Sequence, residues 1–494
     1  MTNLSGANLN NGTAVGPQGE GRESPSSFPK YPAYKDSGVE WLGEIPEHWA
    51  IFSLKRSVDG CTNGLWGDEP DGENDLAVIR VADFDRATCR IGLDKLTYRS
   101  ITQKERASRL LQSGDLLIEK SGGGEKTLVG CVVLFEHKFQ AITSNFVARM
   151  RPLPSFDSSF LCYAFDSLYR GKVNFPAIKQ TTGIQNLDSE SYLQERFCFP
   201  TLAEQTQIAR FLDHETARID ALIEEQQRLI ELLKEKRQAV ISHAVTKGLD
   251  PTVPMKDSGV EWLGEVPAHW HVGALKHFIS PVPGAIKTGP FGSHLKSEDM
   301  KEGPYKVFNQ RSVIDADFSA GDNFISEEKF GELRGFTAFP GDVLVTTRGT
   351  IGRAAILPDN AEVGILHPCL LRIQVEKSKI TSSYLCRLIQ ESHLLKTQLS
   401  LLSNSTTIEV IYSETMANLF IPVPPITEQG QIAGFLDDVI RKFGALTSDA
   451  NESVRLLQER RSALISAAVT GKIDVRGWQP PASASSPELA QEAL

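Results

Sequence analysis

Residues 200–248 carry apolar side chains at alternating steps of four and three positions. That spacing predicts a helix with one apolar seam, as in a coiled coil, rather than the stripe of an ordinary surface helix. Glu215, Gln226 and Lys236 occupy the remaining seam positions. About forty helical residues at about 1.5 Å each would form a rod of about 60 Å, longer than one compact domain requires. We therefore expect a second element to cover the seam.

A second stretch, residues 424–478, repeats the first. The letters EQ at residue 204 recur at residue 428, and the letters FLD at residue 211 recur at residue 435. The same four-three spacing predicts that the two helices bury their seams on each other. The predicted pairing positions are Ile208, Leu212, Ile219, Leu222, Leu229, Leu233, Ile432, Leu436, Phe443, Leu446, Leu457 and Leu464.

A second repeat precedes each of two middle regions. The segment KDSGVEWLGEIPEHW, residues 35–49, returns as KDSGVEWLGEVPAHW, residues 256–270, so the chain is an internal duplication. Trp41, Trp49, Trp262 and Trp270 belong to these copies. Side chains that read different targets should differ between copies, so we expect these tryptophans to pack rather than to stack on bases.

The two middle regions are predicted to be mixed α/β. Short β-branched runs separated by Gly, Asp and Pro, such as residues 76–84, 114–120 and 128–135, are typical of strands and turns. Residues 341–352 and 354–358 take equivalent places in the second copy. The middle regions share this skeleton and little else, whereas the helices and the tryptophan segments are nearly copied. The contrast is explained if the two middle regions are binding sites of the same kind that recognise different targets.

Length and composition further limit the number of domains and the class of protein. A chain of 494 residues exceeds one core and predicts several domains. It has no apolar run of membrane-spanning length, and its seven cysteines show no metal-binding spacing. Because the sequence shows no secretory signal, we expect reduced thiols in a cytoplasmic protein. The net charge of −10 weighs against a nucleic-acid partner without excluding one, because residues 51–200 hold as many basic as acidic side chains.

From residue 31 to residue 478, the order of these parts resembles the specificity subunit of type I restriction-modification systems, HsdS. The resemblance rests on the W-x-G-E-[IV]-P-x-H-W segment, a variable region with a GD[LV]L turn, and the EQ-x-x-IA-x-FLD start of a long helix, all present twice. It implies two target recognition domains, each reading half of a bipartite, asymmetric DNA sequence. It also implies an antiparallel helix pair that spaces them.

The same resemblance implies partners. Two modification subunits, which methylate adenine with S-adenosylmethionine, would dock on the helices, and restriction subunits with a motor and a nuclease would join them. Cofactors, namely S-adenosylmethionine, ATP and magnesium, would belong to those partners, and this chain would hold none. The specificity subunit itself would carry no catalysis.

We therefore expect an α+β fold, with two mixed α/β recognition domains joined by two long antiparallel coiled-coil helices and related by pseudo-two-fold symmetry. Half-sites one helical turn of DNA apart, roughly 34 Å, fall within the span of such a rod. The expected divisions are a disordered tail at 1–30, recognition domain 1 at 31–200, a helix at 201–249, recognition domain 2 at 250–424, a helix at 425–478 and a disordered tail at 479–494.

One group of candidate DNA contacts follows the GD[LV]L turns. The segment SGGGEKT, residues 121–127, lacks the spacing of a phosphate-binding P-loop, but glycine-rich backbone can approach DNA closely. In the second copy TTRGT, residues 346–350, takes this place, and its arginine could bind guanine. Solvated surface side chains are the alternative. These candidates are Lys120, Ser121, Lys126, Thr347 and Arg348.

A second group lies in loops rich in amide and hydroxyl side chains, which can bond adenine edges or phosphates. Two of these loops precede the long helices, and a third follows the strand-like YKVFN. Ordinary turns are the alternative. The candidates are Lys179, Gln180, Thr181, Thr182, Asn309, Arg311, Ser405 and Thr406.

No motif supports catalysis. The chain shows neither a cofactor-binding glycine loop with an Asn/Asp-Pro-Pro-Phe/Tyr motif nor a Glu-x-Lys carboxylate cluster for magnesium, because Glu119 and Lys120 are adjacent. We expect a DNA-recognition and assembly subunit. A coiled-coil scaffold that binds only proteins is the alternative, and a cryptic nuclease is a third possibility.

Overall fold

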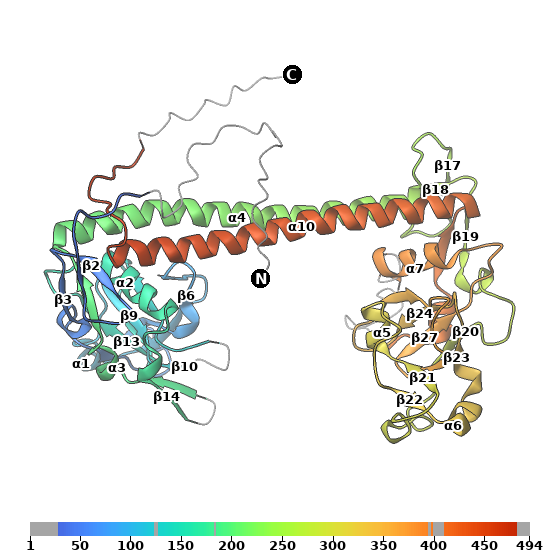
Figure 1. The fold of residues 1–494 in the computed structure, drawn as a ribbon, viewed down its shortest axis with the longest axis horizontal. Helices are drawn as coiled ribbons and strands as arrows, with labels where there is room; N and C mark the ends of the chain where they lie inside the picture. The colour runs from blue at the N-terminus through green and yellow to red at the C-terminus, as the bar shows by residue number, and fades with distance from the viewer. Residues whose placement is uncertain (1–27, 123–126, 182–183, 394–396, 399–409, 482–494) are drawn as a thin grey trace, which may run out of the picture. The chain divides into compact units, whose positions relative to one another are not determined.

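The computed structural model describes residues 28–122, 127–181, 184–393, 397–398 and 410–481. The chain divides into two compact units: unit 1 is Met1–Glu225 with Ser453–Leu494, and unit 2 is Gln226–Glu452 (Figure 1). Each unit mixes helices with several sheets, so the predicted α+β class is confirmed. The terminal segments 1–27 and 482–494, where most of the expected tails fall, lie outside the described residues.

Unit 1 is built on an antiparallel sheet with the strand order β11-β9-β13-β4. Its strands are β4 (Thr62–Asn63), β9 (Asp115–Glu119), β11 (Val132–Phe135) and β13 (Val147–Met150). Every residue of β9, β11 and β13 is buried, because side chains on opposite faces enter two different cores. Leu116 and Ile118 pack with α2 (Ser158–Arg170) in one core, while Leu117 packs with Phe135 in the other.

Smaller elements surround this sheet. Strand β5 (Asp75–Ile79) pairs in parallel with β12 (Ala141–Thr143) and antiparallel with β8 (Thr97–Ser100). A third sheet has the order β10-β15-β14, from β10 (Ser121–Gly122), β15 (Ile184–Leu187) and β14 (Ile178–Thr181). The remaining strands and α-helices are β6 (Phe84–Asp85), β7 (Arg90–Ile91), α1 (Gln103–Arg106) and α3 (Ser189–Tyr192). Short 3-10 helices, labelled η, are η2 (Leu54–Arg56), η3 (Val81–Asp83) and η4 (Phe175–Ala177).

Unit 2 repeats the four-stranded sheet of unit 1 and the core of its second sheet, to which it adds the strand β23 (Thr337–Ala338). Its first sheet has the order β25-β24-β27-β20, from β20 (Ile286–Thr288), β24 (Val343–Thr346), β25 (Ala354–Ile356) and β27 (Leu370–Ile373). Its second sheet has the order β22-β21-β26-β23, from β21 (Tyr305–Phe308), β22 (Phe324–Ile325), β23 (Thr337–Ala338) and β26 (Gly364–Leu366). The pair β21-β26 is parallel, like β5-β12 in unit 1.

The remaining elements of unit 2 are mostly short helices. They are α5 (Gln310–Ile314), α6 (Glu327–Glu332), α7 (Ser382–Glu391), α9 (Ser413–Ala417), η5 (Leu275–His277), η6 (Ser297–Asp299) and η7 (Arg334–Phe336). Helix α7 packs its apolar side chains on the same core as β24 and β27, as α2 does in unit 1. The repeat seen in the sequence is therefore also a repeat of fold.

The tryptophan segments form hairpins at the entrance of each unit. These are β1 (Tyr34–Asp36) with β2 (Glu44–Pro46), and β17 (Met255–Asp257) with β18 (Glu265–Pro267). Two further strand pairs lead into the long helices: β3 (Ala50–Ser53) with β16 (Arg196–Phe199), and β19 (His271–Ala274) with β28 (Phe420–Val423). Trp49 and Trp270 are fully buried, which confirms the packing role predicted for them, whereas Trp262 is half-buried and Trp41 is 41% exposed with its ring stacked on Phe197.

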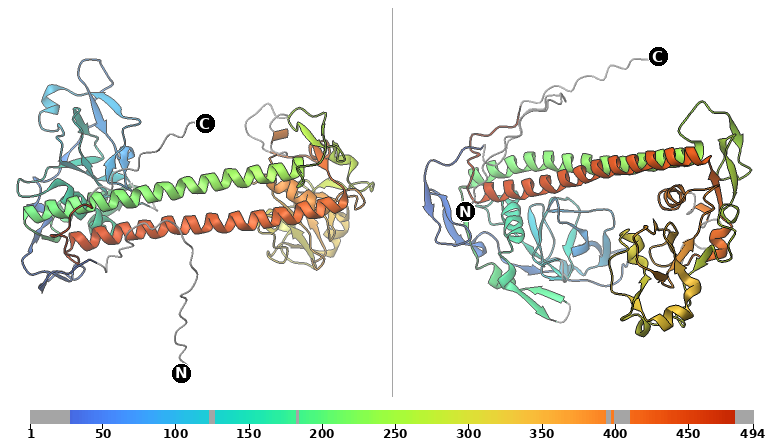
Figure 2. Two further views of the ribbon diagram at one scale, coloured as in Figure 1. Left: turned by 90° about the horizontal axis from the view of Figure 1, so that it is seen from above. Right: turned by 45° about the vertical axis from the view of Figure 1, so that its right-hand side comes forward.

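Two long helices occur where the apolar seams predict them, α4 (Leu202–Lys247) and α10 (Ile426–Val469). In unit 1, Ile208, Leu212 and Ile219 of α4 share a core with Leu464 and Ala468 of α10. The segments run antiparallel there, since Asp220 pairs with Arg461 while Gln207 reaches Val475 (Figure 2). In unit 2, α4 from Ile241 onward shares a core with α10 from Ile432 to Val439.

The observed seam differs from the predicted one at several positions of α4 and at one position of α10. Leu222, Leu229 and Leu446 are 46%, 42% and 51% exposed, so their assignment to the seam is wrong. After Leu212 the next buried position of α4 is Thr216, which lies against Tyr163 of α2, and further along Ile223 and Ile230, next to the predicted positions, are the more buried residues. Thr447, which is half-buried, takes the place of Leu446.

The other predicted seam positions lie on the inner faces of the helices. Ile208, Leu212, Ile219, Ile432, Leu436 and Leu464 are buried, and Leu233, Phe443 and Leu457 are half-buried. A polar contact interrupts the seam, because Arg461 is buried and its Nε lies 2.9 Å from Asp220 Oδ1.

Candidate nucleic-acid interface

The three-stranded sheet of unit 1 brings together two groups of predicted residues that are distant in sequence. Ser121 on β10 pairs with Asn186 on β15, which pairs in turn with Lys179 on β14. The Ser121 hydroxyl donates to Asn186 Oδ1 at 2.6 Å, which fixes this row of side chains. Gln180 lies one position further along β14 and is exposed.

Lys179 in this sheet and Lys120 just before β10 carry ammonium groups that are only weakly held. Lys179 is 74% exposed in its side chain and pairs with Asp188 at 2.7 Å. The Lys179 ammonium lowers the pKa of the Asp188 carboxyl. Lys120 donates from Nζ to Asn63 Oδ1 at 2.9 Å. Exposed pairs of this kind contribute little stability, so either lysine could exchange its partner for a phosphate oxygen.

Four of the predicted residues cannot be placed. Lys126, Thr182, Ser405 and Thr406 lie outside the described residues. Thr181 belongs to the backbone of β14, where it pairs with Ile184, and its side chain is not described. Predictions for these positions stay predictions.

In unit 2, predicted residues from two other segments lie close together. Arg348 follows β24, is exposed, and forms a backbone bridge with Val410. The next residue, Gly349, lies against the side-chain amide of Gln310, at the start of α5. Arg311 follows on that helix with a side chain 88% exposed, paired to Asp315 at 3.1 Å. Arg348 and Arg311 therefore come from two neighbouring surface segments, and both guanidinium groups are accessible.

The remaining two predicted residues of unit 2 have structural roles. Thr347 is fully buried, and its hydroxyl donates to the Cys369 carbonyl at 2.9 Å, so the prediction that it contacts DNA is wrong. Asn309 is the N-cap of α5, and its Oδ1 accepts from the N–H groups of Arg311 and Ser312. Its Nδ2 is the donor left for a contact outside the helix.

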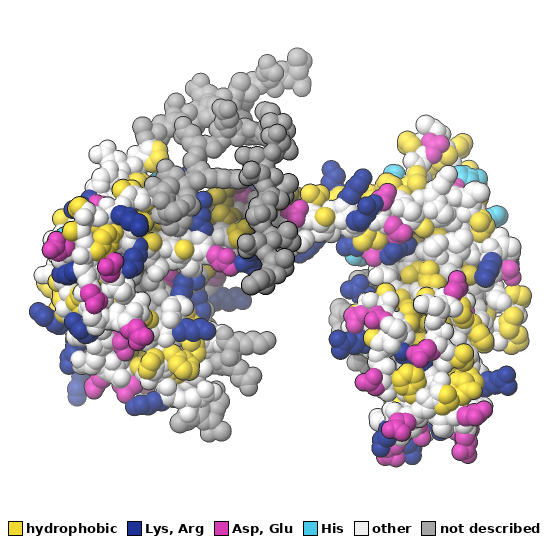
Figure 3. Space-filling model, in the orientation of Figure 1, with side chains coloured by type: hydrophobic (Ala, Val, Ile, Leu, Met, Phe, Trp, Pro, Cys, Tyr) yellow, Lys and Arg dark blue, Asp and Glu magenta, His cyan; other side chains and the backbone are white. Residues whose placement is uncertain are grey.

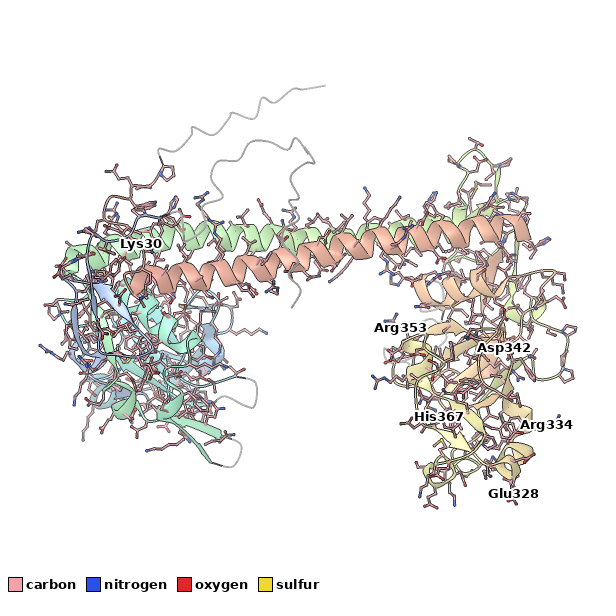
Figure 4. The ribbon with its side chains drawn as sticks, in the orientation of Figure 1. Lys30, Glu328, Arg334, Asp342, Arg353 and His367 are labelled. Atoms are coloured by element: carbon pink, nitrogen blue, oxygen red, sulfur yellow. The ribbon has the colours of Figure 1, made fainter. Side chains whose placement is uncertain are left out.

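The segments that carry Lys120 and Arg348 each follow a strand whose end is held by a buried side chain. In unit 1, Glu119 is fully buried and pairs with Arg86 at 2.7 Å. Burial raises the pKa of the Glu119 carboxyl, and Arg86 acts in the opposite direction. At the equivalent end of β24, the buried Thr346 hydroxyl oxygen accepts the Arg353 N–H at 3.0 Å; Arg353 is labelled in Figure 4. Both anchors fix the direction in which the chain leaves the sheet.

Acidic and basic side chains are mixed on the surface. Figure 3 shows basic and acidic side chains interspersed over the visible face of each unit, without one continuous basic field.

Across the described residues no group of three or more His, Cys, Asp or Glu side chains is arranged to hold a metal ion. None of the described helices is long and apolar enough to cross a membrane.

Glu204 and Glu428, the glutamates of the two EQ pairs, attach the tryptophan segments to the long helices. Trp49 Nε1 and His48 Nε2 reach Glu204 at 3.1 and 2.9 Å. Trp270 and His269 reach Glu428 at 3.1 and 2.8 Å. The sequence repeats both partners but does not show that they meet.

The glutamines of the EQ pairs attach the recognition regions. Gln205 Oε1 accepts the backbone N–H of Asp157, the N-cap of α2, at 3.0 Å. Gln429 Oε1 accepts the N–H of Thr381, the N-cap of α7, at 2.7 Å. One dipeptide therefore joins three elements in each unit.

Sequence reasoning missed a short loop that both units carry. GLWG, residues 64–67, follows β4, and GPFG, residues 289–292, follows the equivalent β20. Trp66 and Phe291 are exposed in these loops. The repeated pattern of glycine, any residue, aromatic residue and glycine was the signal that could have identified it.

Comparisons with known proteins bear on this arrangement. Residues 292–455 match the family described as type I restriction modification DNA specificity domain. The chain is 22% identical over 440 residues to the putative type I restriction enzyme MjaX specificity subunit of Methanocaldococcus jannaschii, which covers 88% of this chain and 96% of that protein. It is 25% identical over 319 residues to the MjaVIII specificity subunit of the same organism, covering 64% of this chain and 70% of that one.

A solved structure shares the fold. It comes from work on complex assembly and conformational transition of the type I R-M system, and its chain matches with a TM-score of 0.64 at 16% identity. The match covers 86% of this chain and 98% of the other. At this identity the likeness concerns the fold alone.

Proposed function

We propose that this chain, which belongs to the family of type I restriction-modification specificity subunits, directs a DNA-modifying complex to a bipartite, asymmetric sequence. Each recognition region would read one half-site. A duplicated recognition unit suits a target with two parts, and divergence between the copies makes those parts different.

One observation carries the proposal. The four-stranded sheets of the two units correspond strand for strand, yet the residues that follow the equivalent strands β9 and β24 differ. Lys120 and Ser121 follow β9, whereas the polar group exposed after β24 is Arg348, because Thr347 is buried. A conserved framework with different exposed polar groups is what two readers of different bases require, since arginine favours guanine while hydroxyl and amide groups favour other edges.

We further propose the domain division set out from the sequence, with recognition domains at 31–200 and 250–424 and helices at 201–249 and 425–478. In this arrangement α4 and α10 form one antiparallel coiled-coil spacer, and the two halves of the chain are related by a pseudo-two-fold axis. The antiparallel contacts in unit 1, the core that both helices share in unit 2, and the repeated Glu204 and Glu428 attachments support this organisation.

Partner subunits would supply the chemistry. We infer two modification subunits docked on the helices, with restriction subunits joining through them, and S-adenosylmethionine, ATP and magnesium bound by those partners. The leucines excluded from the seam support docking, since Leu222, Leu229 and Leu446 expose apolar surface on the helices that a partner would cover. The specificity subunit itself would act by binding alone.

Nuclease footprinting of the complex assembled with its modification subunits tests the proposal. We expect two protected tracts, separated by accessible base pairs, at each methylated site. An uninterrupted cleavage pattern at methylated sites would favour a scaffold that binds only proteins. Magnesium-dependent cutting by this chain alone would indicate a nuclease instead.

A further inference from the structure

Both units present an aromatic ring on a loop bracketed by glycines. Trp66, after β4, is 38% exposed, and Phe291, after β20, is 77% exposed. Exposed apolar surface costs roughly 25 cal/mol per Å² relative to burial, so a large ring held in water in both copies calls for an explanation. The loops follow equivalent strands, which makes the rings counterparts.

The first glycine pins each loop to the same place. Gly64 donates its N–H to the Val147 carbonyl at 3.2 Å, and Gly289 donates to the Leu370 carbonyl at 2.8 Å. A Cβ built on Gly64 would overlap the carbonyl oxygen of Thr143, and a Cβ on Gly289 would overlap that of His367. Only glycine fits such an approach, so the loop is held against the turn before β13 or β27 and projects its ring outward.

In unit 1 the same turn holds a candidate DNA contact. Lys120 donates its backbone N–H to the Phe146 carbonyl at 2.8 Å, and its ammonium group reaches Asn63, directly before the loop. Arg109 Nε also donates to the Asn63 carbonyl, at 3.2 Å. The guanidinium of Arg99 lies 4.7 Å from the centre of the Trp66 ring. One cationic side chain, Arg99, therefore lies over the exposed ring and also pairs with Glu69, while Lys120 and Arg109 hold Asn63 at the start of the loop.

Unit 2 pins its loop on the equivalent turn. The backbone N–H of Thr347 donates to the Cys369 carbonyl at 2.9 Å, so the turn that pins the Phe291 loop also holds the segment carrying Arg348. His367 begins this turn and is labelled in Figure 4. A protruding apolar ring, with a guanidinium beside it in unit 1, suits a duplex, where phosphates flank sugars and base edges.

We propose that Trp66 and Phe291 are equivalent, sequence-independent contacts to double-stranded DNA, in which each ring packs on sugars and base edges beside the phosphates. This inference rests on the proposed function and deepens it. The ring and its glycines recur in both copies, whereas the neighbouring residues at 120–121 and 347–348 differ. Side chains shared by two readers of different bases contribute affinity common to both half-sites, not discrimination.

Anisotropy titrations of the assembled complex on a cognate and an unrelated duplex test it, with the variants Trp66→Ala, Phe291→Ala, Trp66→Phe and Phe420→Ala. We expect each alanine at a loop ring to weaken binding to both duplexes by roughly ten-fold. Trp66→Phe should retain most of the affinity. Phe420→Ala is the matched control, because Phe420 is a 44% exposed phenylalanine on β28, away from the loop, and its loss should change nothing.

The salt dependence of the dissociation constant distinguishes loss of a ring contact from loss of contacts between lysines and phosphates. A ring releases no counterions, so the slope of log Kd against log salt should stay that of the wild type, whereas lost phosphate contacts would flatten it. Unchanged Kd in both alanine variants, loss on the cognate duplex only, or loss of modification subunits from the complex would each overturn the inference. If the wild type shows no sequence preference while both variants still lose affinity on both duplexes, the proposed function fails and the loop contact stands.

Discussion

The indole of Trp49 donates a hydrogen bond to the carboxylate of Glu204, 3.1 Å away, and so joins the entrance hairpin of unit 1 to the first turn of α4. Glu204 also accepts from the Tyr31 hydroxyl at 2.7 Å and contacts His48. The hydrogen bond from Trp270 to Glu428 repeats the joint in unit 2 without a counterpart of Tyr31 among the hydrogen bonds of the described residues.

Replacing Glu204 with Gln should destabilise unit 1 by about 1–3 kcal/mol, because the new amide group would point a donor at a cluster of donors. Glu428→Gln is the matched variant and should have a smaller effect, since its carboxylate loses fewer partners and is 22% exposed against 6% for Glu204. Urea unfolding of both variants measures the difference. An equal or larger effect at Glu428 would contradict the account of the joint.

The observed seam predicts a sharp contrast between neighbours on α4. Ile230 is 7% exposed and Leu229 is 42% exposed. Ile230→Ala should lower the free energy of unfolding by about 2–4 kcal/mol, whereas Leu229→Ala should change it by less than about 1 kcal/mol. Thermal and urea unfolding of the two variants provide the test, and the reverse order would restore the seam predicted from sequence.

Leu229 should instead matter for assembly. If partner subunits cover this outward face, Leu229→Glu should weaken co-purification of the modification subunits while leaving the unfolding curve of the chain unchanged. Ile230→Ala should lower stability first and assembly only as a consequence. Retention of the subunits by Leu229→Glu would place their docking surface elsewhere.

The buried thiols should resist alkylation in the folded chain. Burial raises the pKa of Cys131 to about 12 and that of Cys386 to about 11. A raised thiol pKa means less thiolate at a given pH, so at pH 8 iodoacetamide should leave both unmodified and should label them after unfolding in urea. Mass spectrometry of the labelled peptides gives the readout. Rapid labelling of Cys386 in the folded protein would show that the core of unit 2 opens.

Arg348 and Thr347 are adjacent but should behave differently. Arg348→Ala should relax the preference for one base in one half-site by about 1–3 kcal/mol, because its guanidinium is exposed beside the α5 segment. Thr347→Val should instead cost about 1 kcal/mol of stability with recognition unchanged, since its hydroxyl is bonded inside the domain. Competition binding with single-base variants of the target distinguishes the two effects.

Repetition made the framework predictable from sequence. The long helices, the α+β character and the packing of Trp49 and Trp270 all follow from patterns written twice. The seam was misplaced by one residue because Leu222 and Ile223 are both apolar, as are Leu229 and Ile230, so the spacing alone allows two registers. The packing of the helix against its neighbours decides between them.

The candidate interface was less predictable for a related reason. Thr346 and Thr347 are identical side chains at the end of β24, and both prove to be buried in hydrogen bonds that depend on the distant Cys369 and on the following turn. The row from Ser121 to Lys179 depends on β15, which lies far from β10 in sequence. Contacts of this kind arise from tertiary pairing and leave no local signature.

The central claim is that each recognition region reads its own half of the target. Exchanging residues 271–424 for the corresponding region of another specificity subunit, followed by genome-wide mapping of N6-methyladenine, tests it most directly. We expect a split motif in which one half changes and the other half, read by residues 31–200, is retained. A change in both halves, or in neither, would contradict the account.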